Sequence, residues 1–320
     1  MKNYPKISII TPNLNQDRYL EACIGSVLGQ NYPNLEYIIV DGGSTDKSAD
    51  IIKKYATQLS YWISERDKGQ SEAINKGLKM ASGEIVAWLN SDDLYTQGCL
   101  HTVAELFEQH ADAALVCGHV LNFDDSGSEE IITNDFQLPD FFSRVSLHQP
   151  GIFWRKSATK DYPLLDESLH YCMDYDYWMP LFLNHKVINT EKVLARFRKH
   201  QGSKTNNNPP GLYLEYRTIV SRFFYSLPGS EWKKRLKNSG IDYHPNGKTY
   251  PLNQAFTHNQ LKSIFLVYLY RCVEIAYSRG EFVEVLNLFK RNPNLFTHKT
   301  SCLFLLKTLS GAIFLRKNRY

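Results

Sequence analysis

The sequence predicts an α/β fold with a Rossmann-like, mostly parallel central sheet flanked by helices, followed by a C-terminal helical extension. Short apolar runs alternate with amphipathic segments over the first ninety residues. This alternation is typical of parallel strands joined by right-handed helical crossovers. Beyond residue 211 the apolar residues recur at helical spacing. The chain is therefore expected to have a sheet-forming part and a helical part.

The first strand is expected at Ile7–Ile10, a short apolar run of the kind that is buried in parallel sheets. A helix follows over Asp17–Leu28, where apolar residues recur at helical spacing, and the turn residues at 31–34 end it. A strand at 37–40 is followed by a helix that carries Ile51, Ile52 and Tyr55, and Ser44 or Thr45 is able to cap this helix. A strand at 62–63, a helix over 73–78 and a strand at 85–89 complete this part.

Later segments complete the expected organisation. Strands are expected at 114–123 and 151–154, and residues 206–211 have the Asn, Pro and Gly content of a linker. Helices are expected at 213–224, 260–277, 281–289 and 301–315. The predicted domains are a sheet domain at 1–205, with halves at about 1–110 and 111–205, the linker at 206–211, and a helical region at 212–320.

The composition is that of a globular protein, because 43% of the 320 residues are hydrophobic and 22% are charged. The six cysteines form no C-x-x-C pair and have no metal-site spacing, so we expect reduced, mostly buried thiols. The first residues lead directly into a strand without an apolar signal segment. A cytoplasmic protein is therefore the expectation.

The net charge of +4 is unevenly distributed along the chain. Residues 1–210 carry 20 Lys and Arg against 27 Asp and Glu, a net charge of −7, whereas residues 211–320 carry 17 against 6, a net charge of +11. Such a basic half is able to face nucleic acid, an anionic membrane surface or only solvent. The apolar segment 301–315 is too short to span a bilayer. It either lies in a membrane interface or packs as a closing helix.

Polar clusters follow three of the predicted strands. They are Thr11-Pro12-Asn13, Asp41-Gly42-Gly43-Ser44 and Asn90-Ser91-Asp92-Asp93. In parallel α/β sheets, ligands bind beyond the carboxyl ends of the strands. The sequence therefore predicts a ligand site at this edge of the sheet.

Two of these clusters allow more than one role. Asp92 and Asp93 follow an apolar strand directly, where burying two carboxylates is costly without a cation or hydrogen bonds. They are able to hold Mg²⁺ or Mn²⁺ together with diphosphate oxygens, or simply to cap the following turn and helix. Asp41, followed by two glycines, is able to accept a hydrogen bond from a nucleobase or to stabilise a tight turn.

Five segments, in their order along the chain, resemble family-2 glycosyltransferases of the GT-A type. They are Ile10–Asn15, Val40–Asp46, Asp67–Gln70, Ala73–Gly77 and Leu89–Asp93, and the resemblance extends from residue 6 to about 205. It implies an inverting enzyme that moves a sugar by direct displacement from a nucleotide-diphosphate sugar to an acceptor hydroxyl, in the synthesis of a cell-surface or extracellular polysaccharide or a glycolipid. The half at 1–110 would then bind the donor and the half at 111–205 the acceptor.

The resemblance also implies roles for single residues on the donor side. Asp93 occupies the last position of a D-x-D-like motif, which implies a ligand of a divalent cation, Mg²⁺ or Mn²⁺. Leu14 departs from the pattern, because many members have an aromatic ring there, near the nucleobase. The residues implied to bind the nucleotide sugar are Thr11, Pro12, Asn13, Asn15, Asp41, Ser44, Asp67, Asn75 and Asp92.

The segment Tyr171–Trp178 resembles the acidic motif of the same family, which implies that Asp174 is the general base. A base is needed because an acceptor hydroxyl is a poor nucleophile until its proton is removed. Met173 stands where a Glu is frequent, and Asp176 would face another side of the helix and is expected to be structural. The alternative role of Asp174 is to cap the helix that follows.

Two further segments resemble parts of the family's site. His148-Gln149-Pro150 resembles a motif on the acceptor side, where Trp178 is also implied. Residues Arg196–Ser203 resemble the Arg-x-His-x-x-Ser segment that folds over the diphosphate, and His200 is a further candidate ligand of the metal. Cations and a hydrogen-bonding His suit an anionic leaving group. A solvated loop is the alternative for each segment.

Other functions are weighed against this one. A sugar nucleotidyltransferase would carry a Gly-rich, Arg-containing loop where this chain has Thr11-Pro12-Asn13, and a dehydrogenase would carry G-x-G-x-x-G. A catalytically inactive binding protein is less compatible with a complete set of acidic residues. The expected partners are a nucleotide-diphosphate sugar and a saccharide or lipid-linked acceptor, with no nucleic acid. Peripheral membrane contact of the C-terminal helices, at the inner face of the plasma membrane, is a further expectation.

Overall fold

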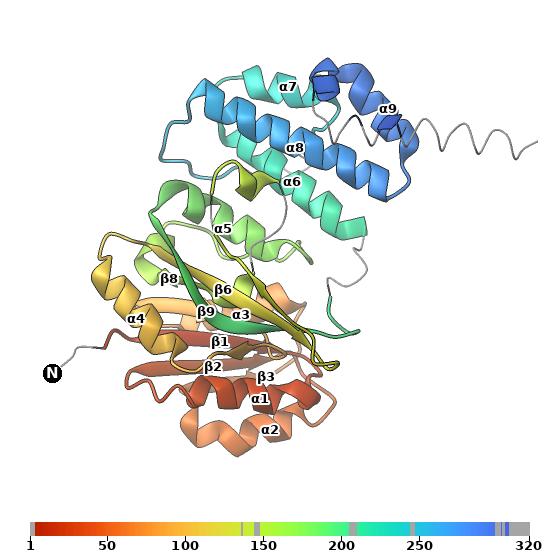
Figure 1. The fold of residues 1–320 in the computed structure, drawn as a ribbon. Coiled ribbons are helices and arrows are strands. Elements are labelled where there is room, and N and C mark those ends of the chain that lie inside the picture. The colour runs from red at the N-terminus through yellow and green to blue at the C-terminus, as the bar shows by residue number, and fades with distance from the viewer. Residues whose placement is uncertain are drawn as a thin grey trace, which may run out of the picture. The chain divides into compact units, whose positions relative to one another are not determined.

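The computed structural model describes residues 4–135, 137–143, 148–204, 210–243, 247–297, 302 and 305–306. The chain divides into two compact units (Figure 1). The first comprises Met1–Phe136 and Ser146–Pro209, and the second comprises Gln137–Val145 and Pro210–Tyr320. A short segment at 137–145 therefore belongs with the C-terminal helices, which the sequence patterns did not indicate.

The described residues of the first unit form one sheet in the order β3-β2-β1-β4-β8-β6-β9-β5, with β7 paired to β6. The part β3-β2-β1-β4 is parallel, β8 is antiparallel to β4 and β6, and β6 is parallel to β9. The strands are β1 (Ile7–Asn13), β2 (Leu35–Asp41), β3 (Tyr61–Ser64), β4 (Ile85–Trp88), β5 (Leu94–Tyr95), β6 (Leu115–Asp124), β7 (Glu129–Ile132), β8 (Ile152–Arg155) and β9 (Val187–Lys199).

Helices cover both faces of this sheet (Figure 1). They are α1 (Asp17–Leu28), α2 (Ser48–Tyr55), α3 (Gln70–Met80), α4 (Cys99–Gln109) and α5 (Met173–Asn184). The first crossovers confirm the predicted alternation of strand and helix. Gly77 lets α3 pack directly on β1, because a Cβ at this position would lie 2.4 Å from Cγ2 of Ile10. The sequence patterns did not indicate α4, β5, β7 or β9.

The predicted cap of α2 is wrong. The helix begins at Ser48, and neither Ser44 nor Thr45 caps it. Ser44 instead donates to Asp41, and Thr45 donates its backbone N–H to Asn15. Both side chains are therefore used at the edge of the sheet rather than at the helix end.

Helices make up the second unit as described. They are α6 (Pro210–Ser226), α7 (Glu231–Ser239), α8 (His258–Ser278) and α9 (Phe282–Arg291). The helices predicted at 213–224, 260–277 and 281–289 lie in α6, α8 and α9, whereas α7 was not predicted. Thr257 and Gln260 form a capping box at the start of α8. Phe142 of the segment 137–145 packs 4.6 Å from Phe223, measured between ring centroids.

Some predictions fall near or on undescribed residues. Of the predicted linker, 206–209 lie outside the described residues, and 210–211 open α6, where Pro210 suits a first helical turn. The helix predicted at 301–315 lies almost entirely outside the described residues. Within the described part of the chain, no helix combines the length and apolarity that a membrane crossing requires. The described cysteines are free, and all but Cys302 are buried, as predicted.

Candidate active site

The carboxyl ends of β1, β2 and β3 meet in register at one edge of the sheet. Asn13 pairs with Asp41, and Asp41 pairs with Ser64. Because β4 lies beside β1, the segment Asn90–Asp93 follows at the same edge. The sheet order therefore brings together the three polar clusters that the sequence places after separate strands.

The buried carboxylate of Asp41 accepts several hydrogen bonds at this edge. Its Oδ1 accepts from Asn13 Nδ2 at 2.6 Å and from Ser44 Oγ at 2.5 Å, and its Oδ2 accepts from Ser44 N at 3.0 Å and Ser64 Oγ at 2.6 Å. Burial by itself raises the pKa of Asp41, but the bonds from Ser44, Ser64 and Asn13 outweigh burial and lower it. The side chain is therefore an ionised carboxylate that ties three strand ends together.

A second set of hydrogen bonds joins Asn15, Ser44 and Thr45 next to Asp41. Ser44 Oγ accepts the N–H of Asn15 at 2.8 Å, and Asn15 Oδ1 accepts the N–H of Thr45 at 2.8 Å. Asn15 has a φ of 53°, in the left-handed region that Asn tolerates. This turn leaves the Leu14 side chain 50% exposed. An uncovered apolar side chain thus stands beside the polar edge.

Gly42 makes room for a second carboxylate. A Cβ on Gly42 would lie 2.6 Å from Oδ2 of Asp67, so a larger residue would displace this carboxylate. Asp67 Oδ1 accepts the N–H of Gly69 at 2.9 Å. Burial raises the pKa of Asp67, and the charges of Glu72 and Asp41 add to this effect. Gly42 therefore lets the carboxylate of Asp67 approach the backbone beside Asp41.

Asp92 and Asp93 have different surroundings. Oδ2 of Asp92 lies 3.0 Å from Nε2 of His200, and both side chains keep some exposed surface. Asp93 is fully buried, its Oδ1 accepts the N–H of Arg198 at 3.0 Å, and its Oδ2 has no hydrogen-bond partner among the described residues. Burial raises the pKa of Asp93 well above its usual value, and the charge of Asp92 raises it further. A buried, unsatisfied carboxyl oxygen is costly.

Strand β9 brings His200 to this edge. β5 begins directly after Asp93 and pairs with β9, so that Leu94 lies opposite Arg196. Arg198 then donates through Nε to the carbonyl of Asp92 at 3.2 Å. Its guanidinium lies between the rings of Tyr19 and Phe123, at 4.8 Å and 4.5 Å from their centroids. Arg198 therefore clamps the backbone of the two acidic residues.

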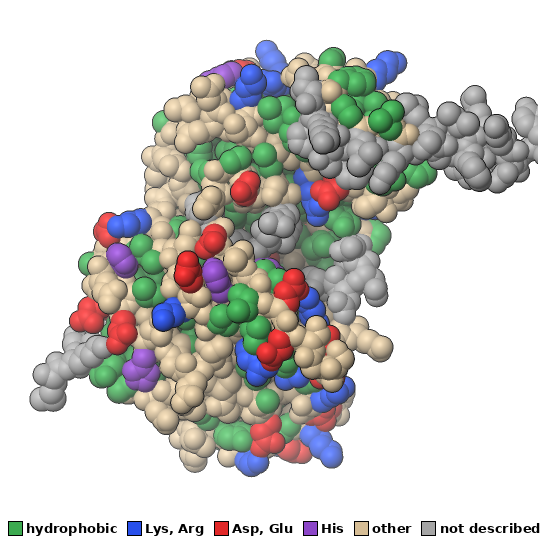
Figure 2. All heavy atoms as spheres, viewed as in Figure 1, with side chains coloured by type: hydrophobic (Ala, Val, Ile, Leu, Met, Phe, Trp, Pro, Cys, Tyr) green, Lys and Arg blue, Asp and Glu red, His purple; other side chains and the backbone are tan. Residues whose placement is uncertain are grey.

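The other cations of this segment are paired with acids, not directed at a ligand. Arg196 contacts Glu129 at 2.7 Å, and Lys199 contacts Glu130 at 3.5 Å. Arg198 itself lies 3.5 Å from Asp125. The interleaving of acidic and basic side chains on the first unit is visible in Figure 2. The resemblance associated this segment with a diphosphate, and these ion pairs were not foreseen because the sequence patterns did not indicate β7, which supplies Glu129 and Glu130.

Asp174 lies in the first turn of α5. The N-cap is Cys172, so Asp174 is inside the helix rather than at its cap. Its Oδ1 accepts the N–H of Tyr175 at 2.7 Å, and the side chain is half-buried. Asp176 is half-buried in the same turn, and its N–H bonds to the carbonyl of Cys172. The structure thus keeps both carboxyl groups near the start of α5.

Three predicted ligand-contacting side chains lie in the interior. Trp178 has no exposed surface and stacks on Trp88, with ring centroids 5.2 Å apart. Gln149 donates to the carbonyl of Trp88, and the hydroxyl of Thr11 lies 3.1 Å from that of Tyr37. These side chains pack against the sheet and α5, because the aromatic core reaches to the end of β4, and their contact with an acceptor or a nucleotide stays a prediction.

Asn75 and His148 make contacts that hold loops. Asn75 Oδ1 accepts the N–H of Leu165 at 2.9 Å, and its Nδ2 donates to Leu165 O at 3.0 Å and Glu167 Oε1 at 3.1 Å. The backbone N–H and carbonyl of His148 both bond to the Asn134 side chain. Asn75 therefore ties α3 to the loop before α5. Pro12 is buried within β1.

Sequence reasoning missed other residues at this edge. Ser64 bonds to Asp41, and Gln70 Nε2 donates to Asn90 Oδ1 at 2.8 Å. The Tyr19 ring lies 4.8 Å from that of His200. Ser64 could have been found, because it directly follows the strand predicted at 62–63 and must lie at the same edge. Tyr19 could not, since it meets His200 only through the fold.

Comparisons with known proteins agree with this fold. The family model described as Glycosyl transferase family 2 matches residues 8–173. An uncharacterized glycosyltransferase of Rickettsia typhi is 29% identical over 302 residues, which cover 87% of this chain and 92% of that protein. Glycosyltransferase GlyG of Streptococcus pneumoniae is 34% identical over 123 residues, which cover 38% of this chain and 40% of that protein.

Solved structures resemble this fold at low sequence identity. S. aureus TarS 1–349 in complex with UDP-GlcNAc has a TM-score of 0.61 at 18% identity, covering 95% of this chain and 89% of that chain. The mannosyltransferase PcManGT from Pyrobaculum calidifontis, in complex with GDP-Man and Mn²⁺, has a TM-score of 0.52 at 15% identity, covering 97% and 81%. The likeness extends over nearly the whole chain and concerns the fold.

Proposed function

The chain belongs to glycosyl transferase family 2, and from this membership we propose that it transfers a sugar from a nucleoside-diphosphate sugar to an acceptor hydroxyl with inversion at the anomeric carbon. The observation that carries this proposal is the convergence of Asp41, Asp67 and Asp92 at one carboxyl edge of the sheet. Such an edge is where parallel α/β sheets bind their ligands.

The donor is proposed to bind over the strand ends. Asp67, Asn15 and Asp92 keep exposed surface there, and Leu14 offers an apolar contact to a nucleobase. Asp41, Ser44 and the Nδ2 group of Asn13 would act mainly by holding this edge rigid, because they already bond to one another, whereas Asn13 Oδ1 has no hydrogen-bond partner among the described residues. Preorganised groups of this kind limit the conformational cost of binding.

Asp92, Asp93 and His200 carry side chains that suit a divalent cation. The described part of the chain contains no cluster of three or more His, Cys, Asp and Glu side chains around one point. Mg²⁺ and Mn²⁺, however, commonly use one or two carboxylates and complete their shell with phosphate oxygens and water. The unsatisfied Oδ2 of Asp93, next to the charge of Asp92, is a feature that a cation would compensate. We assign Asp93 as a ligand and His200 as a second, and a bound cation would neutralise charge on the diphosphate.

Asp174 is proposed as the general base. In the transfer, the acceptor oxygen forms a bond to the anomeric carbon while the bond from that carbon to the diphosphate oxygen breaks. The proton of the acceptor hydroxyl passes to a carboxylate oxygen of Asp174. The leaving group departs as the nucleoside diphosphate, and no covalent enzyme intermediate is formed. Packing of Trp178 on Trp88 holds α5, and with it Asp174, against the sheet.

The acceptor is proposed to be a saccharide or a lipid-linked saccharide, in polysaccharide or glycolipid synthesis at the inner face of the plasma membrane. The charge of +11 over residues 211–320 supports contact with an anionic membrane surface. Basic residues of the second unit that are exposed include Lys234, Lys237 and Lys262.

A panel of nucleotide sugars incubated with Mg²⁺ or Mn²⁺ tests the proposal directly. We expect one of them to be hydrolysed slowly in the absence of acceptor, with release of the nucleoside diphosphate. A sugar nucleotidyltransferase would instead release pyrophosphate from a nucleoside triphosphate and a sugar 1-phosphate. Binding of a donor without any turnover, in the presence of saccharide acceptors, would indicate an inactive binding protein.

A further inference from the structure

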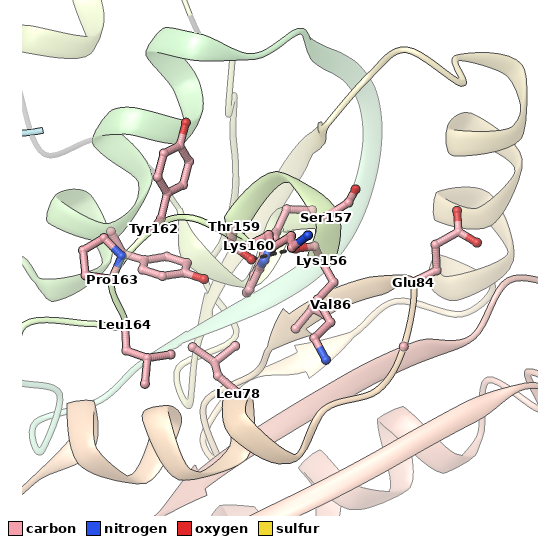
Figure 3. Close-up of a pocket in the computed structure, with 13 residues that line it drawn as sticks. Leu78, Glu84, Val86, Lys156, Ser157, Thr159, Lys160, Tyr162, Pro163 and Leu164 are labelled. Carbon is pink, nitrogen blue, oxygen red and sulfur yellow. Dashed lines mark hydrogen bonds between the residues drawn. The ribbon is translucent and has the colours of Figure 1, made fainter. Parts of the chain in front are cut away.

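A pocket of about 600 Å³ lies in the first unit at the amino end of β4, the end opposite to Asn90–Asp93. Leu78 of α3, Val86 of β4, Trp154 of β8 and Tyr177 of α5 form its walls, and the loop over residues 156–164 closes one side (Figure 3). Its volume is in the range of small-molecule sites. Neither the donor site nor the proposed base uses it.

Apolar side chains dominate the walls of this pocket. Leu78 and Leu164 are neighbours on the wall of the pocket (Figure 3). Leu164 is 39% exposed, and Leu78 is half-buried. Leaving apolar surface in contact with water in a concave site costs free energy, which an apolar ligand would recover.

The rim of the pocket is basic. Lys156 and Lys160 are both exposed and belong to the same loop. Lys156 donates to the carbonyl of Ala81, which holds its ammonium group beside the pocket. Glu84 also lines the pocket, but its carboxylate pairs with Arg155 and lies apart from the two lysines in Figure 3. The polar end of a ligand would therefore meet positive charge.

We propose that this pocket binds an anionic amphiphile, with its apolar part between Leu78, Val86 and Leu164 and its anionic head group at Lys156 and Lys160. A head group alone would meet only exposed lysines, which bind anions weakly in water, and an apolar chain alone would gain nothing from the positive charge at the rim. The combination of both features in one cavity selects a molecule that has both. This site goes beyond the proposed sugar transfer and is separate from the donor edge.

The pocket is connected to the proposed base through one helix. Tyr177 lies three residues after Asp174 on α5, so the two side chains are neighbours on the helix surface. A ligand against Tyr177 therefore contacts the element that carries Asp174.

Binding of dodecyl phosphate to the full-length protein, measured by calorimetry below its critical micelle concentration, tests the proposal. We expect saturable one-to-one binding, and weaker binding, by about tenfold or more, of inorganic phosphate and of octyl glucoside, since each lacks one of the two features. Equal affinity for inorganic phosphate would overturn the proposal in favour of a simple anion site. Equal affinity for octyl glucoside would overturn the role of the lysines.

Exposed residues supply the variants and their matched controls. Lys160→Glu and Leu164→Asp should each weaken dodecyl phosphate binding by about tenfold or more. Lys79→Glu and Met80→Ala, on exposed positions of α3 outside the pocket, should leave it unchanged. An equal loss in Lys79→Glu would show non-specific attraction and refute the site.

The proposed transferase activity is tested separately in the same variants. Hydrolysis of the donor in the absence of amphiphile and acceptor is expected to be the same in the wild type and in Lys160→Glu. If dodecyl phosphate does not bind while hydrolysis proceeds, the amphiphile site is refuted and the transferase function stands.

Discussion

Glu36 offers a stability test that can be worked out from the structure. This β2 side chain is 7% exposed and lies at the amino edge of the sheet. Its Oε2 accepts from Ser8 Oγ at 2.5 Å and Ser82 N at 2.6 Å, and its Oε1 accepts from Ser82 Oγ at 2.6 Å and contacts Lys6 Nζ at 2.7 Å. The carboxylate thereby links β1, β2 and the segment that leads into β4.

The pKa of Glu36 gives the magnitude. Burial by itself raises this pKa, but the bonds from Lys6, Ser8 and Ser82 outweigh burial and lower it from 4.5 to about 2. At about 1.4 kcal/mol per pH unit, the difference between 4.5 and 2 corresponds to about 3 to 4 kcal/mol of folding free energy, which screening by solvent reduces. Because the folded-state pKa is the lower one, this stabilisation is fully present above pH 4.5 and is lost as the pH falls towards 2.

The assay is urea unfolding of the wild type and Glu36→Gln between pH 7 and pH 2.5. At pH 7 we expect the variant to lose about 2 to 3 kcal/mol, because an amide nitrogen would face donors that now bond to a carboxylate. The difference should shrink below pH 4.5. As a control, Glu130→Gln should cost less than about 1 kcal/mol, since Glu130 pairs with Lys199 at the surface. A Glu36→Gln difference that is the same at pH 7 and pH 3 would refute the reasoning.

Three predictions concern function. Asp93→Ala and an excess of EDTA should each abolish donor hydrolysis, while full turnover in EDTA would exclude the metal role. Asp174→Asn should lower turnover by about a hundredfold or more with donor affinity retained, and a wild-type rate would move the role of base to Asp176. Full-length protein should sediment with anionic liposomes but not with neutral ones, and replacing Arg316, Lys317 and Arg319 with Glu should weaken this binding by about a hundredfold or more, at roughly 1 kcal/mol per residue. Unchanged sedimentation of that variant would refute a role of these three residues in membrane binding.

Local patterns in the sequence predicted the first half of the sheet well. The strands around Ile9, Ile38 and Val86 and the helix Asp17–Leu28 are confirmed, because an apolar run or a helical period is a local property of the chain. The polar clusters after these strands could also be placed at one edge of the sheet. Parallel strands of one sheet end on the same side, whatever the distance between them along the chain.

Strands without such a pattern were not found. β9 exposes polar residues along much of its length, and β5 has only two residues. Both depend on partners that are far away in sequence, since β9 pairs with β6 and with β5. Pairing energy that comes from tertiary contacts leaves little trace in local hydrophobic periodicity.

By itself, the sequence determined which residues follow the strands at the carboxyl edge, because strand ends are a local property of the chain, and the order of its motifs indicated the glycosyltransferase family. Only the tertiary structure decided what each side chain does there. Trp178 became a core residue when α5 packed on Trp88, and Arg196 became the partner of Glu129 when β9 and β7 met across β6. The physical reason is that a polar or aromatic side chain takes its role from the partners within a few ångströms, and the fold brings those partners from distant parts of the chain.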